Sequence, residues 1–324
     1  MKSPSPSTVW LLYGNGVDPR DVFCNPKNDP VEAQDLGPRL VEELTKAGFR
    51  VGITWDGSNL SDIAAVISWD ANEQILKNLR EYPRERCFLL VFEPPCVAPS
   101  FYTEVVKNHF GKIFVIPQDF VDNDTYIKFH LPLPPIRWQR AQNPPPFSEK
   151  KLCAFMNGNK FFGAHPDELY TERRRLISFF STKEGEFDLY GRGWEGFPCW
   201  KGVVPHEGLA KVETLKHYKF TITYENMKGA GYIGDKLFPV MTSLSVPVYL
   251  GATDIADYVP KSSFIDRRDF SSHEELYEFL KNMDEKTHES YLASALDFLD
   301  HDPKQEWFTT EYFLQQLLGR LCKL

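Results

Sequence analysis

The sequence predicts an α/β protein with two Rossmann-like domains that face a central cleft, followed by C-terminal helices. Three observations lead to this prediction. The chain has 324 residues, enough for two domains of ordinary size. In each half, short apolar runs alternate with helical patterns, which is typical of βαβ units and parallel sheets. A stretch with six prolines, residues 131–150, separates the two halves.

The first half alternates between the two patterns from residue 8 onward. We expect strands over residues 8–13, 51–54, 64–68, 87–92 and 112–116, and helices over residues 37–48, 72–81 and 98–110. The run CFLLVF at 87–92 is apolar throughout, as in a strand covered on both faces of a parallel sheet. Helix 37–48 carries apolar side chains at helical spacing and ends on Gly48.

The alternation resumes after the proline-rich stretch. Proline lacks an amide donor and fixes its own φ, so residues 131–150 are expected to form a linker between domains 1–145 and 146–324. We expect strands over residues 151–156, 187–190, 219–224, 246–250 and 263–265, and helices over residues 167–180, 208–217, an opening turn near 232–236, and most of 272–322. The last helix is apolar on one face and is expected to pack on a domain. One option is that the chain crosses back and this helix packs on the first domain.

Composition excludes several classes of protein. With 45 acidic and 37 basic side chains the formal charge is −8, which argues against a general nucleic-acid binder. The sequence contains no run of 18 apolar residues, so it predicts no membrane-spanning helix, and the first residues do not resemble a signal peptide. The six cysteines are scattered and are expected to be reduced thiols of a cytoplasmic protein. Peripheral contact with a membrane through the last helix is the alternative.

The segment 218–252 carries the most specific chemical pattern. A strand over residues 220–224 ends in Glu225 and Asn226, and a glycine-rich turn leads to a helix that opens with Asp235 and Lys236. Glycines let backbone amides approach an anion, and the start of a helix and a lysine both add positive charge. This layout suits a diphosphate. An ordinary strand-to-helix turn with a surface lysine gives the same pattern and stays open as the alternative.

The same segment resembles the donor-binding core of the α1,3-fucosyltransferase family, whose pattern is close to Y-K-F, F-E-N, Y-x-T-E-K and P-V-x-x-G in sequence. The matching residues are Tyr218-Lys219-Phe220, Tyr224-Glu225-Asn226, Tyr232, Lys236 and Pro247-Val248 with Gly251. PKSSFI at 260–265 with Asp269-Phe270, and DLYGRGW at 188–194, extend the resemblance. It covers residues 150–285 and is thin over the first domain. The chain departs at Gly234-Asp235, where the family has Thr-Glu.

The resemblance implies a GT-B-type glycosyltransferase of glycan biosynthesis. Its co-substrate would be a nucleotide sugar, GDP-fucose, and the sugar would pass with inversion, and without a metal or other cofactor, to a hydroxyl of a glycan acceptor. The first domain would hold the acceptor and the second the donor. Because aspartate at 235 is one methylene shorter than glutamate, a different nucleotide sugar and a non-catalytic binding protein remain alternatives.

The resemblance also implies roles for single residues. The family places a general base after a buried strand of the first domain, and Glu93 follows residues 89–92 and precedes Pro94-Pro95. The family's arginine at the front of a donor-domain helix corresponds best to Arg173, which is in register with Leu176 and with the other apolar positions of that helix. Donor contacts are expected from Arg173, Tyr224, Glu225, Asn226, Tyr232, Asp235 and Lys236.

One metal-like motif is present in the first half. Asp122-Asn123-Asp124 has the D-x-D spacing of a Mn²⁺ site. It lies between loop segments, away from the donor motif, and Asp and Asn are common turn residues, so we expect a turn. The eight histidines show no metal-binding spacing. The sequence therefore predicts no metal site.

Overall fold

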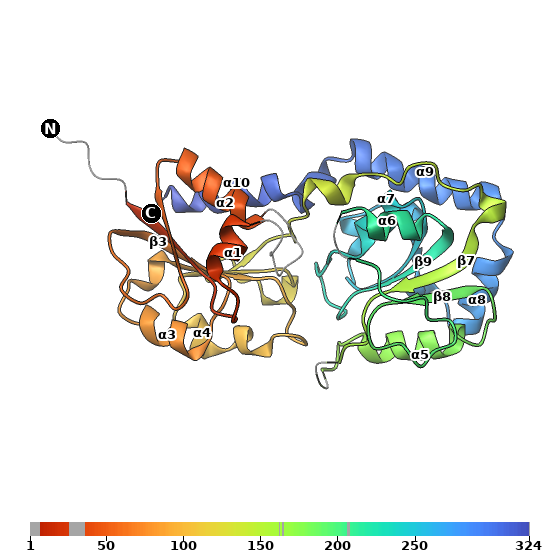
Figure 1. The fold of residues 1–324 in the computed structure, drawn as a ribbon, viewed down its shortest axis with the longest axis horizontal. Helices are drawn as coiled ribbons and strands as arrows, with labels where there is room; N and C mark the ends of the chain where they lie inside the picture. The colour runs from red at the N-terminus through yellow and green to blue at the C-terminus, as the bar shows by residue number, and fades with distance from the viewer. Residues whose placement is uncertain (1–6, 26–35, 162, 164, 206–207, 324) are drawn as a thin grey trace. The chain divides into compact units, whose positions relative to one another are not determined.

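The structure is a computed structural model that describes residues 7–25, 36–161, 163, 165–205 and 208–323. The chain divides into two compact units, here called unit 1 (Met1–Pro134 with Glu306–Leu324) and unit 2 (Pro135–Gln305). Each unit contains one parallel sheet with helices on both faces (Figure 1).

Unit 1 is built on a six-stranded parallel sheet with the strand order β2-β1-β3-β4-β5-β6. Its strands are β1 (Thr8–Leu12), β2 (Arg50–Thr54), β3 (Ile63–Ser68), β4 (Cys87–Val91), β5 (Lys112–Val115) and β6 (Tyr126–Lys128). All five expected strands are present. The edge strand β6 was not predicted, because three residues are too few to show an alternating pattern.

In the described part of unit 1, helices cover both faces of the sheet. Helices α3 (Glu73–Leu79) and α4 (Glu104–Lys107) lie on one face, and α1 (Pro19–Cys24), α2 (Leu36–Lys46) and α10 (Thr310–Leu321) lie on the other (Figure 1). The expectation of one helix over 98–110 is wrong. A 3-10 turn, Pro99–Tyr102, ends at Thr103, whose side chain caps the short helix α4 by accepting from the Val106 amide.

Unit 2 is built on a five-stranded parallel sheet with the order β11-β10-β9-β7-β8. The strands are β7 (Lys151–Met156), β8 (Phe187–Tyr190), β9 (Tyr218–Tyr224), β10 (Val246–Leu250) and β11 (Ile265–Asp266). Because all five strands are parallel, their carboxyl ends meet at one edge of the sheet. Residues that follow β7, β9 and β10 are therefore neighbours at this edge, where open α/β sheets bind ligands.

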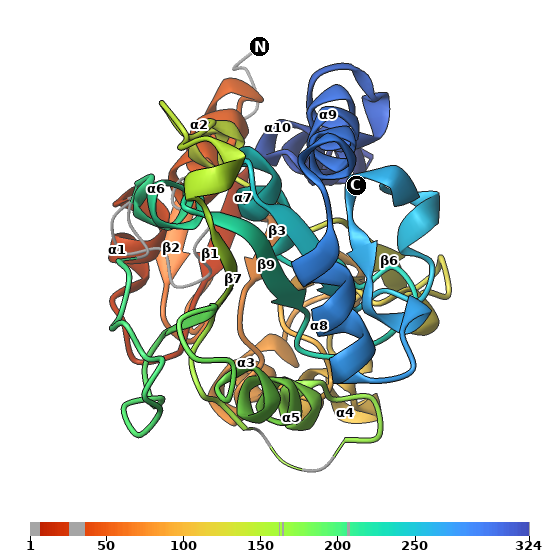
Figure 2. The ribbon, with the colours of Figure 1, turned by 90° about the vertical axis from the view of Figure 1, so that its right-hand side faces the viewer.

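Helices cover both faces of this sheet as well. Helices α5 (Tyr170–Phe180) and α8 (His273–Asn282) pack on one face, and α6 (Ala210–Leu215) and α7 (Leu237–Thr242) pack on the other. Helix α9 (Glu285–His301) lies beside α7 (Figures 1 and 2). The expected helical opening near 232–236 is wrong. Gly231 has φ 64°, so the chain remains a loop until the helix begins at Leu237.

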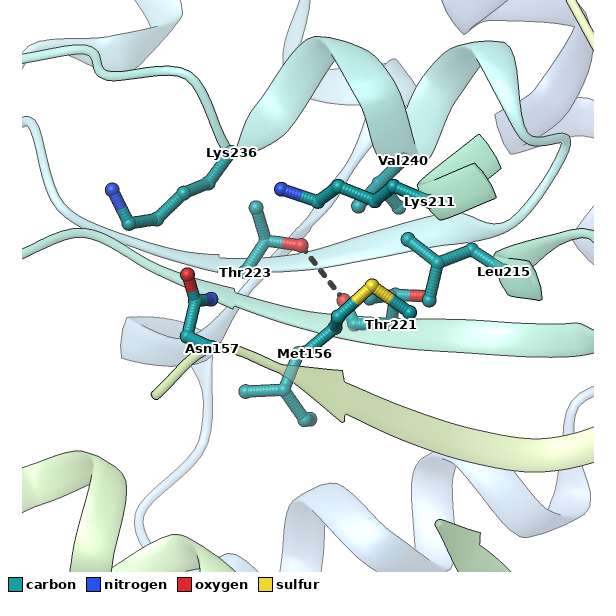
Figure 3. Close-up of a pocket in the computed structure, with 9 residues that line it drawn as sticks. Met156, Asn157, Lys211, Leu215, Thr221, Thr223, Lys236 and Val240 are labelled. Atoms are coloured by element: carbon teal, nitrogen blue, oxygen red, sulfur yellow. Dashed lines mark hydrogen bonds between the residues drawn. The ribbon is translucent and has the colours of Figure 1, made fainter. Parts of the chain in front are cut away.

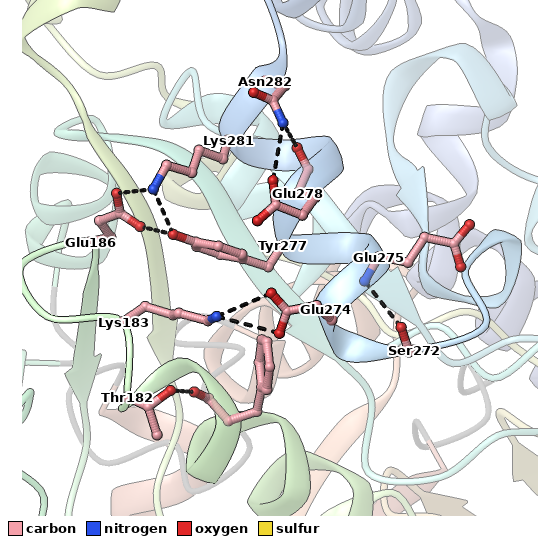
Figure 4. A network of polar contacts seen from close by, with 11 residues as sticks. Thr182, Lys183, Glu186, Ser272, Glu274, Glu275, Tyr277, Glu278, Lys281 and Asn282 are labelled. Atoms are coloured by element: carbon pink, nitrogen blue, oxygen red, sulfur yellow. Dashed lines mark hydrogen bonds and ion pairs between the residues drawn. The ribbon is translucent and has the colours of Figure 1, made fainter.

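A network of polar contacts ties α8 to the segment between α5 and β8 (Figure 4). Lys183 donates to Glu274 at 3.3 Å, and its ammonium lies 4.2 Å from the centre of the Tyr277 ring. The Tyr277 hydroxyl donates to Glu186, which also pairs with Lys281 at 3.0 Å. These contacts hold the helix that covers one side of the unit 2 core.

The division between the units differs from the expected boundary at residue 145. The proline-rich segment belongs to unit 2 from residue 135. The Ala141 amide donates to the Thr242 carbonyl at 2.9 Å, and the Gln142 amide donates to Glu213 at 3.2 Å. The last helix belongs to unit 1, where Phe313 contacts Phe114 with ring centres 6.4 Å apart.

Two further findings concern the whole described chain. All six cysteines have free thiols. In the parts of the chain that the structure describes, none of the helices combines the length and the apolar composition needed to span a bilayer.

Candidate functional site

The candidate site lies at the carboxyl edge of the unit 2 sheet, directly after β9. Glu225 follows the last residue of this strand, and its side chain is fully buried. One carboxylate oxygen, Oε1, accepts from the Gly234 amide at 2.8 Å, and the other, Oε2, lies 3.2 Å from Lys236 Nζ. A buried charge needs such partners, because it has lost its hydration.

Lys236 lies between two carboxylates. Its Nζ is 3.2 Å from Glu225 and 3.1 Å from Asp235, and only 7% of the residue is exposed. Burial lowers the pKa of Lys236, but the charges of Asp235 and Glu225 outweigh it and raise the pKa above its ordinary value. Burial likewise raises the pKa of Asp235, but the lysine charges hold it below its usual range. Lys236 and Asp235 are therefore both ionised at neutral pH.

Glycine is required at two positions around Glu225. A Cβ added at Gly234 would lie 2.7 Å from Glu225 Oε2, and one added at Gly251 would lie 2.5 Å from Glu225 Cγ. The sequence departs from the fucosyltransferase pattern at Gly234. In this chain the Glu225 carboxylate lies in the space that a larger side chain at 234 would occupy.

Arg173 points from α5 toward the end of β9, as its register with Leu176 predicts. It is 3% exposed, and its Nη2 donates to the Tyr224 carbonyl at 2.7 Å and to Asn226 Oδ1 at 3.0 Å. Burial lowers its pKa from the ordinary value. Its Nε has no hydrogen-bond partner among the described residues. The guanidinium thus fixes the end of the strand and keeps one donor available to a ligand.

The two tyrosines of the motif are both buried, in different surroundings. Tyr224 belongs to the hydrophobic core under α5 and α8, and burial raises the pKa of its hydroxyl well above the ordinary value. Tyr232 is 3% exposed and follows Gly231, whose amide donates to Asp254 at 2.7 Å. At Tyr224 it is the backbone carbonyl, rather than the ring, that reaches Arg173.

A pocket opens beside Lys236, between β7 and β9 on one side and α6 and α7 on the other (Figure 3). Lys211 of α6 and Lys236 both extend into it, above Thr223 and Asn157. The lining residues are Met156, Asn157, Lys211, Leu215, Thr221, Ile222, Thr223, Lys236 and Val240. The sequence did not indicate Lys211, because α6 and its cap carry two lysines and nothing in their spacing tells which one turns toward the sheet.

The predicted base belongs to unit 1. Glu93 is exposed and follows Phe92 at the carboxyl end of β4. Its backbone carbonyl accepts from the Tyr102 hydroxyl at 2.9 Å. The Phe92 ring contacts Trp69 edge-on at 5.4 Å, which joins this strand end to the end of β3. Glu93 is therefore an exposed residue at a strand end that these two contacts hold in place.

The D-x-D motif forms a turn, and this prediction is confirmed. The Asp122 side chain accepts from the Asp124 amide at 2.9 Å and from the Tyr126 amide at 2.7 Å, and Asn123 has φ 61°. Within the described ranges, no three His, Cys, Asp or Glu side chains are grouped so that they could hold a metal ion.

Comparison with known proteins connects the candidate site to one family. A family model described as glycosyltransferase family 10 (fucosyltransferase) C-term matches residues 164–313, the part of the chain that contains the site. The chain is 41% identical over 69 residues to an alpha-(1,4)-fucosyltransferase of Arabidopsis thaliana, a match that spans 21% of this chain and 17% of that protein. It is 33% identical over 108 residues to the alpha-(1,3)-fucosyltransferase FucT of Helicobacter pylori, spanning 33% of this chain and 21% of the relative. The matches thus cover well under two thirds of either relative.

The fold extends this similarity to nearly the whole chain. A crystal structure of an alpha1,3-fucosyltransferase with GDP covers 99% of this chain and 92% of its own, with a TM-score of 0.58 and 15% identity. The predicted class, two Rossmann-like α/β domains of the GT-B type with C-terminal helices, is confirmed. The match to the family model lies mostly in unit 2 and ends in the last segment of unit 1.

Proposed function

We propose that the protein is a glycosyltransferase that moves L-fucose from GDP-fucose to a hydroxyl of a glycan acceptor, with inversion and without a metal ion. The observation that carries the proposal is Lys236, buried between Glu225 and Asp235 in the segment that matches the fucosyltransferase family model. The names of the two relatives, and the GDP in the similar crystal structure, support the choice of donor.

The chemistry assigns a role to each part of the site. When the glycosidic bond to the diphosphate breaks, negative charge develops on the leaving phosphate, and we assign the stabilisation of this charge to Lys236 and Arg173. Asn226, Tyr232 and Asp235 would flank the donor. An inverting displacement also needs one base that takes the proton of the acceptor hydroxyl, and we assign this role to Glu93. The acceptor oxygen then bonds to the anomeric carbon as GDP leaves.

A donor panel tests the proposal. The protein is incubated with GDP-fucose, GDP-mannose and UDP-glucose, each with a set of oligosaccharide acceptors and with EDTA present, and nucleotide release and product mass are measured. We expect turnover of GDP-fucose alone. Turnover of another donor would favour the alternative that the Gly234-Asp235 sequence leaves open. Binding without turnover would favour a non-catalytic protein. Loss of transfer in EDTA, restored by Mn²⁺, would refute the metal-free mechanism.

The stereochemistry is tested separately. NMR coupling constants give the anomeric configuration of the transferred sugar in the first product formed. A product configuration opposite to that of the donor supports inversion. The same configuration in donor and product would refute the single displacement, and with it the assignment of Glu93 as its base.

We also propose a cytoplasmic location, which the six free thiols support. Fractionation of cells that express the untagged chain tests this. Recovery with the membrane fraction, and release from it by salt, would favour peripheral contact instead.

A further inference from the structure

The loop between β9 and α7, residues 226–236, is here called the donor loop, because it contains most of the residues to which we assign donor contacts. It is rich in glycine, with Gly229, Gly231 and Gly234. Glycine gives a chain wide conformational freedom, so keeping such a loop in one shape costs conformational entropy. Contacts from other parts of unit 2 have to offset this cost.

The two ends of the donor loop are fixed by backbone hydrogen bonds. At its start, the Leu169 amide, just before α5, donates to the Asn226 carbonyl at 2.9 Å. At its end, the Gly234 amide donates to the Glu225 carboxylate at 2.8 Å. The middle of the loop lies between these two points and needs a contact of its own.

Asp254 supplies a contact for the middle of the loop. The Gly231 amide donates to Asp254 Oδ1 at 2.7 Å. Gly231 has φ 64°, so the chain turns there, and Tyr232 is the next residue. A hydrogen bond from an amide to a carboxylate is about twice as strong as one between neutral groups. Asp254 therefore fixes the turn that leads into the second half of the donor loop.

The way in which Asp254 uses its side chain is unusual for its position. It precedes the 3-10 turn Ile255–Asp257, but its side chain makes no capping hydrogen bond to that turn. Aspartate at such a position commonly accepts from an amide of its own helix. Asp266 does so, since it accepts from the Arg268 amide at 3.0 Å. The Asp254 carboxylate instead reaches across to the donor loop.

This hydrogen bond joins the ends of two neighbouring strands. Asp254 follows β10 in the chain, and the donor loop follows β9, to which β10 is paired in parallel. Both strands therefore end at the edge of the sheet where open α/β folds bind ligands. Asp254 is thus a link between the donor loop and the adjoining strand end of unit 2.

We propose that Asp254 is a positioning residue for donor binding: by accepting from the Gly231 amide, it keeps the donor loop in the shape that binds the nucleotide sugar. The inference rests on the proposed function, since it assumes that this loop binds such a donor. Asp254 lies outside the residues that carry the resemblance to the fucosyltransferase family. It acts through the backbone of the loop rather than on the ligand.

Two measurements on the full chain test the proposal. Hydrogen exchange, followed by mass spectrometry, reports on peptides that cover residues 226–236, and titration calorimetry gives the affinity for GDP. We expect Asp254→Ala to speed exchange in the donor loop and to weaken GDP binding, each about 10-fold or more, because a hydrogen bond to a charged group is lost. Asp254→Asn keeps an oxygen that accepts from the amide and should bind GDP within about 3-fold of the wild type.

Asp257→Ala is the matched control. Asp257 belongs to the same 3-10 turn and is exposed, and the structure shows no hydrogen bond or ion pair of its carboxylate with another described residue. This variant removes the same charge and should change neither loop exchange nor GDP affinity.

A transfer assay separates positioning from a general loss of structure. With GDP-fucose as the donor, Asp254→Ala should raise the KM for the donor about 10-fold, and the KM for the acceptor should change less than about 2-fold. Misfolding of a fraction of the protein would lower kcat and leave both KM values unchanged.

The outcomes also separate this proposal from the proposed function. GDP binding in the wild type, with loop exchange or GDP affinity unchanged in Asp254→Ala, would overturn the role of Asp254 alone. So would an equal effect of Asp257→Ala, or a loss in Asp254→Asn as large as in Asp254→Ala. A wild-type chain that does not bind GDP would refute the proposed donor and with it the role of Asp254 in binding it.

A second variant covers the case in which Asp254→Ala does not fold, which circular dichroism shows. The hydroxyl oxygen of Asp254→Ser lies one bond closer to the backbone than a carboxylate oxygen, so it does not reach the Gly231 amide. Weaker GDP binding with faster loop exchange in this variant would support the proposal. Wild-type GDP affinity in the folded variant would overturn it.

Discussion

Replacing Lys236 by methionine tests how the candidate site is held together. Methionine keeps the length and most of the volume of the side chain but removes its charge. Glu225 would then remain fully buried with the Gly234 amide as its nearest donor, because its other oxygen pairs with Lys236 at 3.2 Å. Asp235 would lose a partner at 3.1 Å but keeps partial contact with solvent.

The expected size of the effect follows from the burial of the pair. Removing one partner of a buried ion pair leaves an uncompensated charge and destabilises a protein by about 3–5 kcal/mol. For a domain of about 150–250 residues this corresponds to a melting temperature lower by about 6–20 °C. Removing the charge of Glu225 as well, in the double variant Glu225→Gln with Lys236→Met, should restore a large part of the stability, because the fully buried carboxylate is then no longer left unpaired.

Urea unfolding at pH 7, followed by circular dichroism, measures the effect. Lys228→Met is the control, because this lysine has 51% of its side chain exposed and pairs with Asp167 at 3.5 Å. Exposed pairs contribute about 0–1 kcal/mol, so the control should be close to wild type. If Lys236→Met lowers the free energy of unfolding no more than the control does, the reasoning is refuted. It would mean that Glu225 is protonated or gains another partner in the variant.

The remaining predictions concern catalysis, packing and pH. Glu93→Gln keeps the shape of the side chain and should lower kcat by about 100-fold or more, with donor binding unchanged. A near-normal kcat of this variant on a true acceptor would exclude Glu93 as the base. Gly234→Ala should destabilise unit 2 by about 1–3 kcal/mol in the same urea assay, because its Cβ would lie 2.7 Å from the Glu225 carboxylate. Burial lowers the pKa of His288 from 6.5 to about 4. The unfolded chain therefore takes up this proton first, and the free energy of unfolding should fall as the pH drops from about 6.5 to 4, by up to about 3 kcal/mol. His288→Gln should lack this part of the pH dependence, and equal pH profiles for the two proteins would contradict the shift.

The sequence by itself predicted the class of fold and most of its strands. Parallel strands covered on both faces are often apolar along their whole length, so β4 is visible as an uninterrupted apolar run. The inward direction of Arg173 was also predictable, because a helix repeats every 3.6 residues and its apolar positions mark the buried face. The strand end at Glu225 followed from the same local pattern.

What only the tertiary structure decided depends on contacts between residues that are distant in the chain. The last helix belongs to unit 1 because Phe313 packs against Phe114, and neither residue alone indicates this partner. Lys211 joins the pocket of Lys236 because α6 and α7 cover the same face of the sheet. The close approach of Gly234 to the Glu225 carboxylate is likewise seen only in the folded chain, because the two residues are nine positions apart. Spacing along a chain reports on local conformation, whereas the balance of charge and volume in a site is set by which elements the fold brings together.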